Sequence, residues 1–104
     1  MAPERIRTKE VERLLKVFAA IDNPDHIFAL LQDLCTVREI QDMSQRLDVA
    51  YMLAQGEHYA EIQEQTRVSA TTISRVSKAL NYGADGYRVA IEILGGGKPE
   101  ATEE

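Results

Sequence analysis

The sequence contains no tryptophan, only two phenylalanines and a single cysteine, Cys35. A lone cysteine excludes a disulfide within the chain and favours a reducing compartment, where a free thiol is stable. No apolar run approaches the roughly 18 residues of a membrane-spanning helix, and no basic stretch leads into an apolar one near the start. We therefore expect a cytoplasmic protein with neither a membrane span nor a signal peptide.

Sustained alternation of polar and apolar residues, the pattern of a half-buried strand, is also missing. The chain has 104 residues, of which 44% are hydrophobic. This length suits one domain with one core, and such a chain buries only about 60–70% of its unfolded surface, so dimer formation adds materially to stability. We predict an all-α fold with a single helical domain over residues 1–94.

The net charge of −5 excludes a protein that coats DNA indiscriminately. The charges are segregated, however. Between Thr66 and Ala84 the sequence has Arg67, Arg75 and Lys78 and no acidic residue. This pattern indicates a basic head on an acidic body.

Apolar residues recur at helical spacing near the start of the chain. After a loose start over residues 1–7, we expect a first helix from about Thr8 to Ala20. Asn23 and Pro24 begin a second helix, because asparagine caps free N–H groups and proline needs no donor at the first position. This helix ends near Cys35, which we expect to be buried. The two buried stripes are Val11, Leu14, Leu15, Phe18 and Ile21, and Ile27, Leu30, Leu31 and Leu34.

The longest helix is predicted to begin at a capping box formed by Thr36 and Glu39, whose side chains accept hydrogen bonds from each other's backbone N–H groups. It continues to Gln55 and ends at Gly56, a residue type common just after a helix. Its apolar residues occupy more than one face, so a second copy of the chain is expected to cover part of it. These residues are Ile40, Met43, Leu47, Val49, Ala50, Tyr51, Met52, Leu53 and Ala54.

The segment from Tyr59 to Tyr82 has the pattern of a helix-turn-helix. A short helix ends near Thr66, Arg67 and Val68 form the turn, and Ser69 caps the next helix. Two short helices with a polar, cationic outer face are typical of a DNA reader. The buried anchors that hold the second helix are expected to be Ile62, Val68, Ile73 and Val76, with Leu80 continuing the stripe.

The second helix places Thr71, Arg75 and Lys78 opposite its apolar stripe, because each residue advances by about 100°. Threonine methyl groups suit thymine and arginine suits guanine, whereas Arg67 and Lys78 favour phosphates. The candidate DNA-contacting residues are Arg67, Ser69, Ala70, Thr71, Thr72, Arg75 and Lys78.

Two residues depart from the usual helix-turn-helix pattern. Gln63 occupies a position that close helix contact usually keeps small. Arg67 lies in the turn, where glycine adopts a positive φ without strain. With the acidic net charge, these departures support an alternative: a helical dimerisation or adaptor module that does not bind DNA, whose exposed charges are solvated.

The rest of the chain carries no pattern typical of an enzyme. His26 and His58 are far apart and lack neighbouring metal ligands, and the glycines at 95–97 precede a tail instead of a helix. We expect no catalysis and no cofactor. Gly83 should end the recognition helix, and a last helix should follow Asp85. Residues 95–104, GGGKPEATEE, have the composition of a flexible acidic tail.

The chain from about Leu30 to Leu94 resembles the Trp repressor superfamily, specifically its TrpR-like YerC/YecD family. The resemblance is carried by LLQDLCTVREIQDMSQRLDVAYML, GE, EIQEQT and ATTISRVSKALNYGADGY, within which ISRVSKALNYG is the most specific piece. It implies six helices in an intertwined homodimer, with two projecting helix-turn-helix heads. It also implies transcriptional regulation through a pseudo-palindromic operator.

The resemblance further implies an effector pocket with candidate residues Thr36, Arg46, Arg75, Val76 and Ala79. In Trp repressors tryptophan lies between two arginines, at positions matched by Arg46 and Arg75. The family's glycine beside the indole is Val76 here, and the serine that receives the ammonium group is Ala79. A site that lacks a polar partner for its ligand loses affinity strongly. We therefore expect no tryptophan response, and a structural role for both arginines or binding of another small anion.

Overall fold

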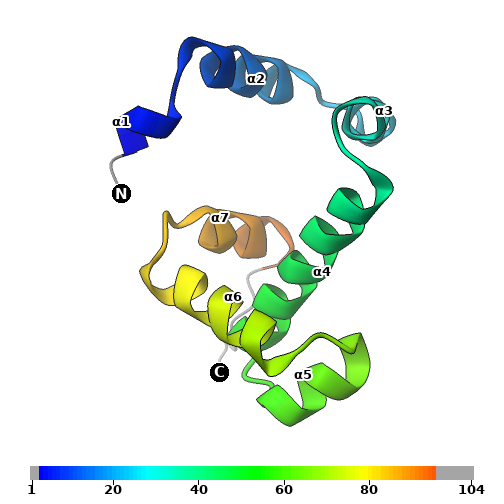
Figure 1. Cartoon of the computed structure of the whole chain (residues 1–104), viewed down its shortest axis with the longest axis vertical. Helices are drawn as coiled ribbons and strands as arrows, with labels where there is room; N and C mark the ends of the chain where they lie inside the picture. Colours follow the sequence, from blue (N-terminus) through cyan, green and yellow to red (C-terminus); the bar gives the residue numbers. More distant parts are fainter. Residues whose placement is uncertain (1–2, 96–104) are drawn as a thin grey trace. The chain divides into compact units, whose positions relative to one another are not determined.

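The computed structural model describes residues 3–95, and within this range the chain forms helices and no strand (Figure 1). This confirms the predicted all-α fold. The helices are α1 (Pro3–Ile6), α2 (Lys9–Ala20), α3 (Pro24–Leu34), α4 (Val37–Ala54), α5 (Tyr59–Thr66), α6 (Ala70–Tyr82) and α7 (Gly86–Ile93). The chain divides into two compact units, and the boundary along the sequence lies between Ile40 and Gln41, within α4.

The six predicted helices correspond to α2 to α7, and α1 is an additional single turn. The expectation of a loose start was wrong over residues 3–6. Pro3 has the fixed φ that suits the first position of a helix. The N–H of Thr8 donates to the carbonyl of Ile6 at 2.9 Å, which closes the connection to α2.

The caps of α2 and α3 are those that the sequence predicts. The Thr8 hydroxyl accepts from the N–H of Val11 at 3.3 Å. The Asn23 side chain accepts from the N–H of Asp25 at 2.8 Å, and Pro24 occupies the first position of α3. Both helices therefore begin where a side-chain oxygen satisfies a free backbone donor.

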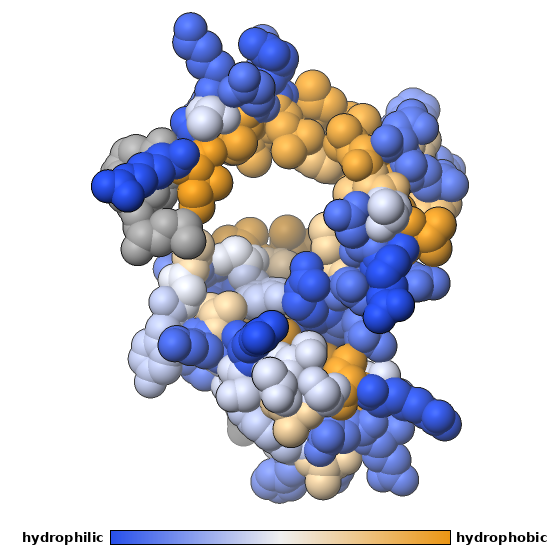
Figure 2. Space-filling model, viewed as in Figure 1, coloured by the Kyte–Doolittle hydropathy of each residue, from blue (hydrophilic) through white to orange (hydrophobic). Residues whose placement is uncertain are grey.

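The apolar stripes of α2 and α3 are not buried in the single chain, contrary to expectation. Leu15 of the first stripe is 41% exposed and Leu34 of the second is 54% exposed. Cys35, also expected to be buried, is only half-buried. Hydrophobic residues gather along one side of α2 and α3 in Figure 2, and hydrophilic residues lie on the other side of α2. Two short helices cannot enclose both stripes without a further layer facing them.

The start and end of α4 agree with the prediction. The Glu39 carboxylate accepts from the N–H of Thr36 at 2.7 Å, and the Thr36 hydroxyl accepts from the N–H of Glu39 at 3.0 Å. After α4, Gly56 has a φ of +88°, a conformation that glycine adopts without strain.

The core lies in the second unit, where α6 packs against both α5 and α7 (Figure 1). Its side chains come from the carboxyl half of α4, from one side each of α5, α6 and α7, and from the turn after α5. The predicted anchors are all buried, and Ile62 and Ile73 have no exposed surface. The buried residues are Val49, Ala50, Ile62, Val68, Ile73, Val76, Leu80 and Ile91.

None of the helices within residues 3–95 is both long enough and apolar enough to cross a bilayer. The predicted flexible tail lies outside the described residues, apart from Gly95.

Candidate nucleic-acid interface

The turn between α5 and α6 places Arg67 in the left-handed region, with a φ of +65° and a ψ of +15°. This is the conformation that the sequence pattern associates with glycine at this position. The N–H of Arg67 donates to the carbonyl of Gln63 at 2.8 Å, which ends α5. A left-handed arginine is strained, so the surrounding contacts have to hold it.

Thr66 supplies part of that support. Its hydroxyl donates to the carbonyl of Ile62 at 2.7 Å and accepts from the N–H of Val68 at 3.3 Å. The side chain therefore connects the last turn of α5 to the residue after Arg67. Val68 is 8% exposed and packs in the core, which anchors the far side of the turn.

Gln45, on α4, supplies a second support that was not among the predicted site residues. Its side-chain amide donates to the carbonyl of Thr66 at 3.1 Å. This hydrogen bond ties the end of α5 to α4 just before the left-handed residue. No local sequence signal indicates it, because the two partners are 21 residues apart and Gln45 lies on an exposed position.

Ser69 caps α6 as predicted. Its Oγ accepts from the N–H of Thr72 at 3.1 Å, and its hydroxyl donates to Oγ1 of Thr72 at 3.2 Å. Both side chains therefore make hydrogen bonds at the start of α6. Behind them Ile73, Val76 and Leu80 are buried, so the helix is held along one whole side.

The side of α6 opposite the core is polar and cationic. The predicted DNA-contacting residues Arg67, Ser69, Ala70, Thr71, Arg75 and Lys78 are exposed, and Thr72 is half-buried. Tyr82, which was not among the predicted contacts, lies at the carboxyl end of the same side and is 85% exposed. Arg75 and Lys78 therefore face solvent, as a nucleic-acid reader requires.

The departures from the helix-turn-helix pattern have a structural explanation. Gln63 is exposed, so its long side chain does not have to fit into the core. Arg67 adopts the left-handed conformation in place of glycine. Neither residue prevents the motif from forming.

The residues matched to the effector pocket differ in burial and in the contacts that they make. Val76 is 2% exposed and belongs to the core, whereas Arg46 and Arg75 are exposed. The Thr36 hydroxyl, in the first unit, is used in the capping box. Ala79 is half-buried and lines an open depression of about 450 Å³ with Ala84, Gly86 and Tyr87, which includes no charged side chain.

Among residues 3–95, no group of three or more histidine, cysteine, aspartate or glutamate side chains is arranged to hold a metal ion.

Comparison with known proteins places these features in one family. The model of the Trp repressor protein family matches residues 9–94. The uncharacterized protein YerC of Bacillus subtilis strain 168 is 39% identical over 92 residues, 88% of each chain.

Two solved structures share the fold. A crystal structure of a candidate Trp repressor from Staphylococcus aureus has a TM-score of 0.85 and 36% identity, and covers 92% of this chain and 96% of its own. A TrpR-like protein from Eubacterium eligens has a TM-score of 0.83 and 40% identity, with 88% of this chain and 95% of its own covered.

Proposed function

The chain belongs to the Trp repressor protein family, and from this membership we propose that it is a sequence-specific transcriptional regulator that binds duplex DNA as a homodimer. Its reader is the helix-turn-helix formed by α5 and α6. One observation carries the proposal: α6 keeps its apolar side in the core and turns its threonine and cationic side outward. A helix presented in this way suits the major groove.

Base reading falls to the exposed amino-terminal half of α6. The Thr71 methyl group suits the methyl group of thymine, and the Ala70 side chain offers a similar apolar contact. Arg75 is exposed and has a guanidinium group that can donate two hydrogen bonds to guanine. These three side chains are therefore the proposed determinants of sequence preference.

Phosphate contacts fall to the flanks of the same helix. Arg67 and Lys78 are exposed cations before and after the reading residues, and long cationic side chains bind phosphates without reading sequence. Ser69 and Thr72 bond to each other, so we assign them to the helix start, whose free N–H groups also favour a phosphate.

A second copy of the chain accounts for the apolar surface of the first unit. Leu15, Phe28 and Leu34 are each more than a third exposed in the single chain. Covering such side chains is favourable by about 25 cal/mol per Å² of apolar surface. Two readers related by a two-fold axis then address half-sites about 34–36 Å apart, so the operator is pseudo-palindromic.

Tryptophan is not the proposed effector. Val76, which is 2% exposed, stands at the position where Trp repressors have glycine, so its side chain would fill the space that glycine leaves for the indole. Ala79 has no hydrogen-bonding side chain for an ammonium group. The proposal is therefore a regulator that binds its operator with equal affinity in the presence and absence of tryptophan.

The decisive experiment selects bound sequences from a random duplex library, using the full chain with and without tryptophan. The expected result is one enriched pseudo-palindrome, the same in both conditions. Fluorescence anisotropy with the selected duplex and a scrambled duplex then measures the specificity ratio. Recovery of no sequence, with the dimer intact, would instead support the helical adaptor module.

A further inference from the structure

The segment before and within α2 is the second cationic part of this acidic chain. Residues 5–16 contain five basic and two acidic residues, a surplus of three positive charges in a chain whose net charge is −5. The reader segment from Thr66 to Ala84, with three basic residues and no acidic one, has the same surplus. The proposed function does not use the cationic cluster of residues 5–16.

Three of these cations share one side of α2. Lys9, Arg13 and Lys16 fall at i, i+4 and i+7, within an arc of about 60° on a helix that advances about 100° per residue. All three are exposed. We call them the α2 ridge. They line an open depression of about 510 Å³, whose other lining residues are Arg7, Thr8 and Glu12.

The α2 ridge lies opposite the apolar stripe of the same helix. By the same helical geometry, the centre of the apolar stripe lies about 180° around the helix from the centre of the ridge. The stripe consists of Val11, Leu14, Leu15 and Phe18. A partner that covers the apolar stripe consequently leaves the ridge facing outward. The ridge remains accessible in a homodimer that uses α2 for its core.

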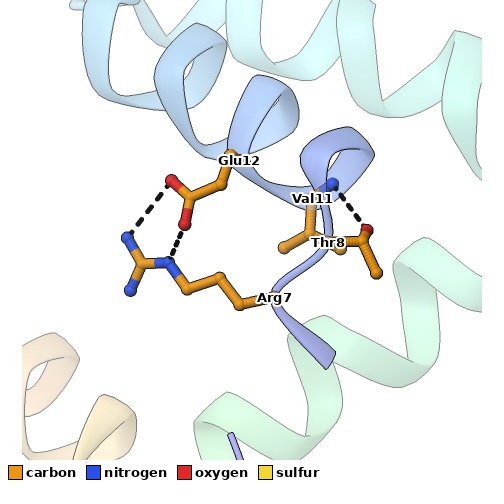
Figure 3. Close-up of polar contacts among 4 residues, drawn as sticks. All are labelled: Arg7, Thr8, Val11 and Glu12. Atoms are coloured by element: carbon orange, nitrogen blue, oxygen red, sulfur yellow. Dashed lines mark hydrogen bonds and ion pairs between the residues drawn. The ribbon is translucent and has the colours of Figure 1, made fainter. Parts of the chain in front are cut away.

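Arg7 neutralises the charge of Glu12, the acidic residue that lines the same depression as the ridge (Figure 3). Its guanidinium group bonds both carboxylate oxygens of Glu12, through Nε and, at 3.5 Å, through Nη2. The hydrogen bond and the charge of Glu12 raise the pKa of Arg7 above its ordinary value. With Glu12 paired, the three ridge cations are not offset by that carboxylate.

Membrane lipid is the less suitable anionic partner. An interfacial helix buries its apolar side in the lipid and keeps its cations on the polar side. In the proposed homodimer the partner covers the apolar stripe of α2, so the stripe is not available to lipid. A phosphate backbone needs only an outward row of mobile cations.

We propose that the α2 ridge is a second contact surface for the phosphate backbone of duplex DNA, outside the helix-turn-helix. This inference rests on the proposed function, because it takes the chain to be a protein that binds duplex DNA. The ridge adds affinity without sequence preference, since lysine and arginine bind phosphates irrespective of base.

The test compares the salt dependence of operator binding in full-length variants. Lys9→Gln/Arg13→Gln/Lys16→Gln removes the charges, and Lys9→Arg/Arg13→Lys/Lys16→Arg is the matched control that keeps them. The slope of log affinity against log salt falls by about 0.9 for each phosphate that is no longer neutralised. We expect the slope of the neutral variant to fall by about 2 to 3 per protomer, with its preferred sequence unchanged, and the control to keep the slope. Thermal melting of both variants checks that the fold is intact.

Three outcomes separate the hypotheses. An unchanged slope in the folded neutral variant overturns the ridge proposal and leaves the proposed function standing. Absence of DNA binding by the unaltered protein overturns the proposed function itself. Vesicles of phosphatidylserine test the lipid alternative: vesicle binding that disappears only in the neutral variant, with DNA binding unaffected, assigns the ridge to membranes and also overturns the proposal.

Discussion

Arg75 and Lys78 lie three residues apart on the exposed side of α6, yet they are expected to act on DNA in different ways. Arg75 is closer to the amino end of the helix, which enters the groove first. Lys78 is almost one turn further along, where we expect the helix to meet the phosphate backbone. In the proposed function, position along one helix thus separates base reading from charge neutralisation.

Replacing each residue by alanine tests this division. Lys78→Ala should weaken binding to all duplexes alike and lower the salt slope by about 1, because it leaves one phosphate without its cation. Arg75→Ala should relax selectivity at one or two base pairs and cost about 1–3 kcal/mol on the preferred operator. Anisotropy titrations on single-substitution operators measure both effects. The same decrease of selectivity in both variants would contradict the assignment.

Arg67 combines a strained backbone with an exposed cationic side chain. Arg67→Gly should stabilise the fold by about 0.5–1 kcal/mol, because relief of the left-handed strain exceeds the added flexibility of the unfolded chain. The same change should weaken DNA binding and reduce the salt slope by about 1. Denaturant unfolding and anisotropy give the two values. Arg67→Lys is the control, since it keeps both the charge and the strain.

At the scale of elements, the turn between α5 and α6 depends on contacts from outside the motif. The Thr66 side chain links the two sides of the turn, and the side-chain amide of Gln45 on α4 donates a hydrogen bond to the Thr66 carbonyl. The core residues beneath α6 fix its buried side. We therefore expect recognition of DNA to depend on α4 as well as on the helix-turn-helix, because the bond from Gln45 helps to hold the turn in place.

Gln45→Met tests the contribution of this hydrogen bond, since methionine has a similar length and no donor. We expect the free energy of unfolding to fall by about 0.5–1.5 kcal/mol. Affinity for the preferred operator should fall several-fold with an unchanged salt slope, because every phosphate keeps its cation. Gln41→Met, at another exposed glutamine one turn earlier on α4, is the matched control and should behave like the unaltered chain. A reduced salt slope in Gln45→Met would contradict this account, because it would show that the loosened turn withdraws a cation such as Arg67 from a phosphate.

At the scale of the whole molecule, the two units differ in how completely they bury their apolar residues. The second unit has a core in which Val49, Ile62 and Ile73 have no exposed surface. The first unit has none of its described residues fully buried. A stable helical pair needs a further apolar layer, and in the proposed homodimer a second copy of the chain provides one with matching chemistry.

The homodimer can be tested by placing a charge in the apolar stripe. The unaltered chain should have about twice its monomer mass of 11.7 kDa in sedimentation equilibrium. Leu15→Glu should shift it towards monomer or unfold the first unit, because a buried carboxylate without a partner is costly. Gln32→Glu, at an exposed polar position of α3, should leave the dimer intact. A monomeric unaltered chain at micromolar concentration would refute the dimer.

The sequence by itself determined the helices α2 to α7 and their ends, but not the single turn α1. The capping side chains each accept a hydrogen bond from a backbone N–H no more than three residues away, so the local sequence is enough to predict them. These caps are Thr8, Asn23, the pair of Thr36 and Glu39, and Ser69. The anchors of α6 were also predictable, because helical periodicity places them on one side. Only the tertiary structure decided which stripes are covered in one chain, and which residue of α4 holds the turn. Burial depends on the layer that faces a stripe, and the bond from Gln45 to Thr66 joins residues far apart in sequence, so neither is encoded in local spacing.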